Sequence, residues 1–179
     1  VYGKTLEAML AIHPGTEQVF VVTSLPNNGG QARENIDRHE LARFDSELKL
    51  TYLTDLPTSE LVDKLSHAPP NSLVLYVRHA EDSSEGGLNP VEAASLLARV
   101  SSVPMYSIAR TYFGQGIVGG YLADHEVIGA QAGELALRIL SGARPETLHA
   151  TNASLTPLFD WRAMERWNIA PARLPPGSD

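Results

Sequence analysis

Two short runs constrain the fold of this chain more than any other part of its sequence. Residues 18–23 (QVFVVT) and 72–77 (SLVLYV) are apolar almost throughout and rich in β-branched side chains. Such continuous runs are typical of strands in a parallel sheet that is buried on both faces. Further strands are predicted at residues 48–53 (LKLTYL) and 103–109 (VPMYSIA). The polar–apolar alternation of residues 48–53 favours a place near the edge of the sheet.

Segments with helical periodicity separate these strands. Helices are predicted at residues 4–13, 31–44 and around residues 61–65. Another helix should begin after Asn89, a good N-cap residue, with Pro90 in the first helical position. Strands that alternate with helices at this spacing predict an α/β fold, in which helices sandwich a parallel, Rossmann-like sheet.

The stretch from residue 106 to residue 140 carries the strongest local signals. After the predicted strand and the polar and aromatic residues 110–113, four glycines surround a short apolar run, at Gly114, Gly116, Gly119 and Gly120. A long amphipathic helix is then predicted from Asp124, its N-cap, to Ser141. Its apolar face comprises Ile128, Ala132, Leu135, Ala136, Ile139 and Leu140. Beyond it we predict a short helix at residues 160–168 and a linker or tail at residues 174–178.

Composition excludes several classes of function. The 179 residues suffice for one core, or for one lobe and part of another. A net charge of −7 argues against nucleic-acid binding, which needs a basic face. The chain has no cysteine, so it has no disulfide, thiolate nucleophile or cysteine metal site. No apolar run approaches the ~20 residues of a membrane helix, and neither a metal site nor a cofactor is predicted.

The candidate site lies where the predicted parallel strands end. In open α/β sheets, ligands bind at the carboxyl ends of the strands, where the strand order reverses. Two arginines there could hold a carboxylate, aromatic side chains could form an apolar wall, and hydroxyl and amide groups could donate and accept hydrogen bonds. We therefore predict a site for a small polar or zwitterionic ligand, formed by Ser24, Asn27, Asn28, Arg78, His79, Arg110, Thr111, Tyr112 and Phe113.

A competing interpretation rests on one of these residues. Residues 75–81 (LYVRHAE) resemble the strand-end Arg-His motif of histidine phosphatases, in which the histidine accepts the phosphate. His79 would be that nucleophile, and His125 could be imagined as a second catalytic histidine. Two predicted βα units precede the motif here, whereas the phosphatase motif lies on the first strand of its domain.

The sequence VPMYSIARTYFGQGIVGGYLADHEVIGAQAGELALRILSGARPETL, with FDWRAMERWNIAPARLPPGS after it, resembles the periplasmic substrate-binding-protein-like family related to ABC transporters. More narrowly, it is similar to the version found as the N-terminal sensor region of bacterial sensor histidine kinases. The resemblance covers nearly the whole chain. It implies a type I periplasmic-binding-protein fold, with two Rossmann-like lobes joined by crossing strands and a ligand between them.

The same resemblance implies how the chain is divided. Residues 1–109 would form the C-terminal-type lobe, residues 110–144 a crossover strand and helix of the N-terminal-type lobe, and residues 145–179 a return segment and tail. The rest of the N-terminal-type lobe is missing, and we expect this chain, which begins at Val1, to be a piece of a longer one. Residues 117–122 should then pack elsewhere, against the chain's own sheet or a second molecule, and a homodimer is expected from such an unpaired strand.

The implied function is that of a non-enzymatic sensor domain that binds a small polar or aromatic metabolite. It would lie in the periplasm or outside the cytoplasm, and would be linked to a membrane only through the missing flanking segments. Two alternatives stay open: a free solute-binding protein of an ABC transporter, and a phosphotransfer enzyme that uses His79.

Overall fold

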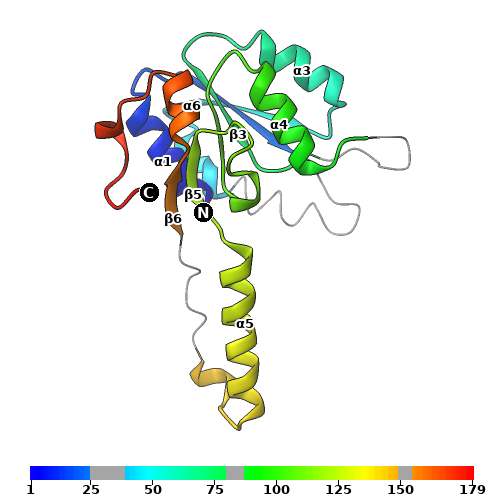
Figure 1. The fold of residues 1–179 in the computed structure, drawn as a ribbon, viewed down its shortest axis with the longest axis vertical. Coiled ribbons are helices and arrows are strands. Elements are labelled where there is room, and N and C mark those ends of the chain that lie inside the picture. Colours follow the sequence, from blue (N-terminus) through cyan, green and yellow to red (C-terminus); the bar gives the residue numbers. More distant parts are fainter. Residues whose placement is uncertain (25–38, 80–86, 149–154) are drawn as a thin grey trace.

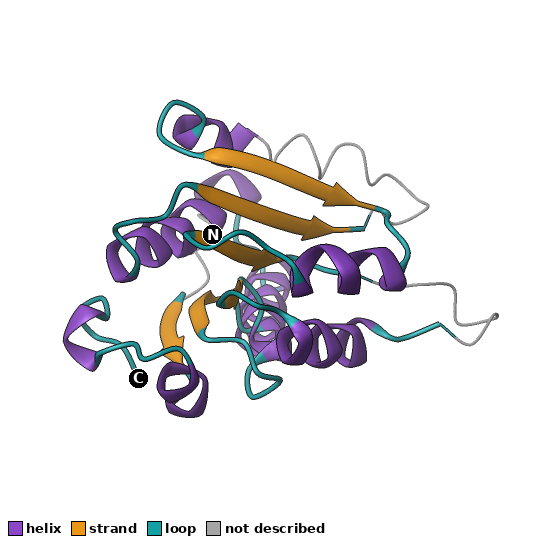
Figure 2. Cartoon of the chain, turned by 90° about the horizontal axis from the view of Figure 1, so that it is seen from above, coloured by secondary structure: helices purple, strands orange, loops and turns teal. Residues whose placement is uncertain are grey.

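The computed structural model describes residues 1–24, 39–79, 87–148 and 155–179. Within them, four parallel strands form one sheet in the order β2-β1-β3-β4. The strands are β1 (Gln18–Thr23), β2 (Lys49–Thr54), β3 (Ser72–Tyr76) and β4 (Met105–Ser107). They run side by side in one direction (Figure 2). The predicted fold class is confirmed, and β2 lies at an edge of the sheet as its alternating pattern indicated.

Helices cover both faces of this sheet because the side chains of each strand point alternately to opposite sides. Val19 and Val21 of β1 join the core beneath one set of elements, α1 (Tyr2–Ile12), η1 (Ala42–Phe44) and α6 (Trp161–Arg166). Phe20 and Val22 join a second core beneath α3 (Thr58–Ser66) and α4 (Pro90–Val100). The continuous apolar runs of the sequence therefore supply two cores at once.

The predicted start of α4 is confirmed. The Asn89 side chain accepts hydrogen bonds from the backbone N–H groups of Val91 (3.0 Å) and Glu92 (3.1 Å). The Glu92 carboxylate in turn accepts the backbone N–H of Asn89 at 3.1 Å. This reciprocal arrangement satisfies backbone donors that a helix end otherwise leaves without a partner.

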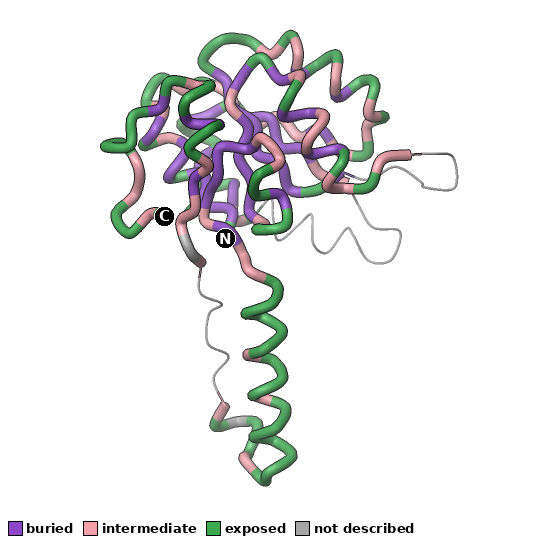
Figure 3. Tube along the Cα trace, viewed as in Figure 1, coloured by how far each residue is buried: buried purple, intermediate pink, exposed green. Residues whose placement is uncertain are grey.

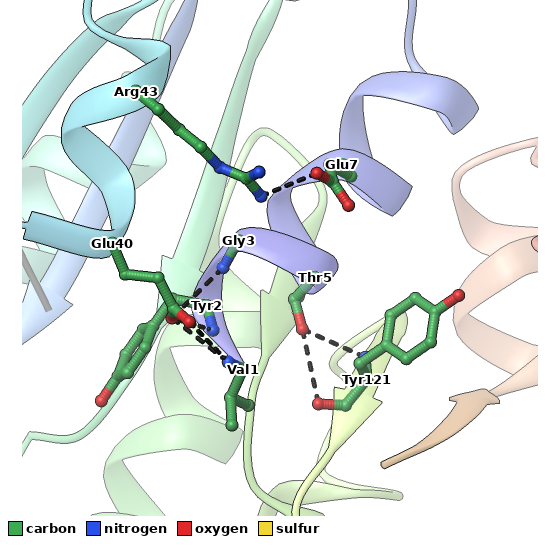
Figure 4. A network of polar contacts seen from close by, with 8 residues as sticks. All are labelled: Val1, Tyr2, Gly3, Thr5, Glu7, Glu40, Arg43 and Tyr121. Carbon is green, nitrogen blue, oxygen red and sulfur yellow. Dashed lines mark hydrogen bonds and ion pairs between the residues drawn. The ribbon is translucent and has the colours of Figure 1, made fainter.

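The start of α1 is held by a residue distant in sequence (Figure 4). The Glu40 carboxylate accepts the backbone N–H groups of Tyr2 (2.7 Å) and Gly3 (3.4 Å), and the Val1 ammonium lies 2.9 Å from it. Burial raises the pKa of Glu40, but the ammonium and the two backbone N–H groups outweigh burial and hold the pKa below its ordinary value. A negative charge therefore sits at the positive end of the α1 dipole.

A small second sheet continues the fold beyond β4. Strand β5 (Gly119–Leu122) pairs antiparallel with β6 (Thr156–Phe159). Just before β5, the backbone N–H of Val118 donates to the Met105 carbonyl of β4 at 2.7 Å. Thr5 of α1 holds β5 in place as well, because its Oγ1 accepts the backbone N–H of Tyr121 at 3.1 Å (Figure 4). Of the two expected arrangements for residues 117–122, the chain thus adopts packing against its own lobe.

Helix α5 (His125–Leu140) leaves this body and projects from it (Figure 1). Asp124 is its N-cap, as predicted: its side chain accepts the backbone N–H groups of Glu126 (3.0 Å) and Val127 (3.4 Å). No residue of α5 is buried (Figure 3). Leu137 and Leu140 are 66% and 84% exposed. The apolar side of α5 therefore contributes no buried side chain to the described part of the chain.

The segment predicted as a linker or tail, residues 174–178, is followed and preceded by residues that contact the lobe. After η5 (Pro171–Arg173), the chain folds back on β6: the Asp179 backbone N–H donates to Pro157 O at 3.0 Å, and the Asp179 carbonyl accepts from Phe159 N at 2.9 Å. Arg173 also donates to the Ile12 carbonyl at the end of α1, at 3.1 Å. Residues 174–178 themselves form no helix or strand, and their assignment as a linker or tail stays a prediction.

Candidate ligand-binding site

The sheet has one place where its strand order reverses, between β1 and β3. Strand β1 has β2 on one side and β3 on the other, and the chain therefore leaves the carboxyl ends of β1 and β3 in opposite directions. The backbone N–H groups of Val77 and Arg78 both lie close to the Val22 carbonyl, at 2.9 and 3.3 Å. We call the side of the sheet where all four strands end the carboxyl edge.

Two predicted site residues meet at this reversal. The Ser24 hydroxyl donates to the Arg78 carbonyl at 3.3 Å, which joins the segments that follow β1 and β3. The Arg78 side chain is exposed, and within the described residues its guanidinium forms no ion pair. Arg78 thus has donors in a fork suited to a carboxylate. Asn27 and Asn28 lie outside the described residues.

His79 lies beneath the surface rather than on it. Its side chain is 2% exposed, and its Nε2 is 2.9 Å from the Thr58 Oγ1 at the start of α3. Its backbone N–H donates to the Tyr76 hydroxyl at 3.0 Å, and that hydroxyl donates to the Pro90 carbonyl at 2.7 Å. Burial, aided by Tyr112, raises the pKa of Tyr76, so the phenol keeps its proton and can donate. His79 and Tyr76 therefore tie the end of β3 to the starts of two helices.

The four predicted residues after β4 divide between the surface and the core. They lie in and after η3 (Arg110–Tyr112). Arg110 and Thr111 are exposed, and Phe113 is 37% exposed. Tyr112 is 6% exposed, and its ring meets that of Tyr76 edge-on, with 4.9 Å between centroids. The structure thus brings Ser24 and Arg78 together, leaves Arg110, Thr111 and Phe113 beside the end of β4, and buries His79 and Tyr112.

Arg110 has a partner that the sequence did not indicate. Its Nη1 donates to the Asp124 Oδ2 at 2.7 Å, in an ion pair whose arginine side chain is 58% exposed and whose aspartate is 20% exposed. Burial raises the pKa of Asp124, but hydrogen bonds from the backbone of α5 and the nearby Arg110 guanidinium outweigh it and lower that pKa. Asp124 is therefore ionised at neutral pH.

Two further residues of the carboxyl edge escaped sequence analysis. Asp55 follows β2 with a positive φ of 52°, and its backbone N–H donates to the Thr23 carbonyl at 3.2 Å. It brings an exposed carboxylate to the same edge. Thr58 fixes the His79 ring. Asp55 could have been found from its position two residues after the strand predicted at residues 48–53, by a criterion close to the one that selected Ser24 and Arg78.

A separate hollow lies away from these residues. An open groove of about 410 Å³ runs along α4 and is lined by Leu88, Val91, Glu92, Ser95, Leu96, Arg99 and Gln115. It includes none of the predicted site residues. Among the described residues, no cluster of histidine, aspartate and glutamate side chains could hold a metal ion. Within the same parts of the chain, no helix combines the length and the apolar character needed to span a bilayer.

Comparisons with known proteins agree with this architecture. No protein-family model and no curated protein sequence matches the chain. A conserved domain protein from Vibrio cholerae shares the fold with a TM-score of 0.64 and 18% identity, over 98% of this chain and 56% of that one. A ligand-free, open substrate-binding protein with adhesive properties from Clostridium difficile matches with a TM-score of 0.66 and 12% identity, over 93% and 55%.

A third solved structure, an ABC domain in complex with L-Trp from Streptococcus pneumonia, matches with a TM-score of 0.64 and 10% identity, over 94% of this chain and 56% of that one. At such identities the likeness shows the fold alone. The chain shares its α/β fold with these structures and spans a little over half of their length.

Proposed function

We propose that this chain is a non-enzymatic, ligand-binding sensor domain of a bacterial signal-transduction protein of the histidine kinase type. Its ligand would be a small polar or aromatic metabolite, held at the carboxyl edge of β1 and β3. The observation that carries the proposal is the meeting of Ser24 and Arg78 where the strand order reverses, which is where open α/β sheets bind ligands. The neighbour that holds L-Trp supports a small-molecule ligand.

The chemistry of the edge favours a zwitterion. The exposed Arg78 guanidinium can bind a carboxylate through two parallel hydrogen bonds. Asp55, which follows β2, carries an exposed negative charge that would attract an ammonium group. Phe113 offers an exposed aromatic face beside the end of β4. An amino acid with an aromatic side chain would use all three.

Closure of two lobes around the ligand would carry the signal. Because the chain spans only part of each neighbour, the other wall of the cleft would come from residues outside this sequence. We place the domain in the periplasm or outside the cytoplasm, connected to a membrane through flanking segments, with a homodimer as a possible assembly of the intact protein.

Calorimetric titration with L-tryptophan and a panel of other amino acids tests the proposal on the intact gene product. Arg78→Ala should weaken binding at least tenfold, since it removes a charge-assisted pair worth more than ~1.4 kcal/mol. Arg99→Ala removes the same charge from the last turn of α4, away from the carboxyl edge, and should leave the affinity unchanged. Binding that neither variant alters, or no binding across the panel, would contradict the proposed site.

The free solute-binding protein of a transporter is the second candidate, supported by the substrate-binding neighbour from Clostridium difficile. The coding sequence downstream of Asp179 separates the two, because a kinase region there belongs only to the sensor. The phosphotransfer alternative requires an accessible His79, whereas that side chain is 2% exposed. If the protein hydrolyses p-nitrophenyl phosphate and the activity disappears in His79→Ala, that result would support the phosphotransfer alternative.

A further inference from the structure

Helix α5 leaves the lobe at a point where three interactions converge. The Ala123 backbone N–H donates to the Ile108 carbonyl at 2.8 Å, and the Arg110 backbone N–H donates to the Ala123 carbonyl at 3.1 Å. The third interaction is the 2.7 Å ion pair between Arg110 and Asp124. Residues 109 and 123 are thereby bridged in parallel, directly before the helix begins.

Asp124 performs two tasks with one carboxylate. Its Oδ1 accepts the backbone N–H groups of Glu126 and Val127, which fixes it to the first turn of α5. Its Oδ2 accepts from Arg110, which belongs to the lobe. The Asp124 side chain therefore connects the first turn of α5 to η3, in addition to the backbone hydrogen bonds of Ala123.

This connection matters because α5 has no buried residue that could set its direction by packing. Figure 1 shows the helix standing away from the body of the lobe. An exposed ion pair contributes little to global stability. If α5 can leave the lobe in several directions of similar energy, a small free-energy difference is enough to favour one of them. An exposed ion pair can supply that difference.

We propose that Arg110 is a positioning residue which, paired with Asp124, fixes the direction in which α5 leaves the lobe. The pair is a latch at the base of the crossover helix, and its loss lets α5 sample a wider range of directions while the lobe stays folded. This role concerns the ligand-free chain, so it stands or falls independently of the proposed ligand site.

The latch can be tested by distance measurements between two spin labels. The chain contains no cysteine, so two cysteines can be introduced as the only labelling sites. Glu134→Cys places one label on α5 and Glu47→Cys places the other on the lobe, and both positions are exposed. The width of the distance distribution then reports how tightly the direction of α5 is held. Far-UV circular dichroism of each variant verifies that α5 is still helical.

The substitutions separate the ion pair from the helix cap. Asp124→Asn keeps a good N-cap acceptor but removes the charge, and Arg110→Gln removes the charge of the partner. Asp160→Asn is the matched control, because Asp160 caps α6 in the same way, accepting the Arg162 N–H at 2.9 Å, and has no part in the latch.

Both Asp124→Asn and Arg110→Gln should broaden the distribution, the double variant no further, and Arg110→Lys should restore most of the narrow distribution. High salt should broaden the distribution of the parent chain and of Asp160→Asn alone, since screening weakens an exposed ion pair. Parent-like widths in either Asp124→Asn or Arg110→Gln would overturn the proposal, because each substitution breaks the same pair.

Discussion

Replacing Gly120 with alanine should destabilise the lobe strongly. Gly120 lies in β5 with φ of +146°, a conformation that residues with a Cβ rarely adopt. An added Cβ would collide with the Ser107 carbonyl oxygen of β4 and approach the Thr5 Cγ2 to 2.8 Å. Both neighbours are 0% exposed, so neither can swing away into solvent.

The expected cost follows from these two effects. Backbone strain of this kind costs ~1–3 kcal/mol, and forcing a methyl group into a filled core costs a similar ~1–3 kcal/mol. Alanine also reduces the conformational entropy of the unfolded chain, which stabilises the folded state by ~0.4–1 kcal/mol. We therefore expect Gly120→Ala to lower the free energy of unfolding by about 3 kcal/mol, or the melting temperature by roughly 6–12 °C.

Urea unfolding followed by tryptophan fluorescence measures this loss as a shift of the midpoint at constant slope. Gly129→Ala is the matched control, since the Cβ would meet no atom within 4 Å on exposed α5. Alanine there should preserve or raise helix stability, by up to ~1 kcal/mol. A Gly120→Ala midpoint within ~0.5 kcal/mol of the parent, the usual range of a neutral surface substitution, would refute the packing of β5 against β4 and α1.

Two further substitutions probe the same core. Thr5→Val should lower the free energy of unfolding by ~1–3 kcal/mol, because the partly buried backbone N–H of Tyr121 loses its 3.1 Å acceptor. Thr5→Ser keeps a hydroxyl there and should retain most of the stability in the same urea experiment. Burial, and then the charge of Arg173, lowers the pKa of His13 from its ordinary 6.5, so the unfolded chain takes up this proton first as the pH falls. The stability contributed by neutral His13 is fully present at pH values above its ordinary pKa of 6.5 and declines as the pH falls below that value. Between about pH 7.5 and about pH 5.5 the parent should therefore lose more stability than His13→Gln, and equal losses would contradict the assigned shift.

Local patterns predicted the parallel sheet because its strands and helices carry their own periodicity. The buried runs around Val21 and Leu75, and the caps at Asn89 and Asp124, each depend on a few neighbouring residues. Strand β6 escaped prediction because its four residues include Pro157 and gain their structure by pairing with β5 far away in sequence. The pairing of Asp179 with β6 escaped prediction for the same reason.

The candidate site shows a different limit. Topology places polar residues at the carboxyl edge, and Ser24 and Arg78 meet there as expected from their positions after two neighbouring strands. Topology does not decide which way a side chain points. His79 and Tyr112 turn inward because Tyr76 and Thr58 offer them ring contacts and hydrogen-bond partners. The assignment of the nine predicted residues to a ligand stays a prediction.

The burial of individual residues shows where the lobe ends more directly than the resemblance to other proteins does. The sequence suggested that the crossover begins at residue 110, a division that stays a prediction. Ile117 and Leu122 are 0% and 1% exposed, so residues 117–122 belong physically to the core of the lobe. From the first residue of α5 onward, directly after the Asp124 cap, no residue of the helix is buried. A hinge at the Arg110–Asp124 pair would therefore move α5 as one body and leave Ser24 and Arg78 in place, so Asp124→Asn and Arg78→Ala should have separable effects.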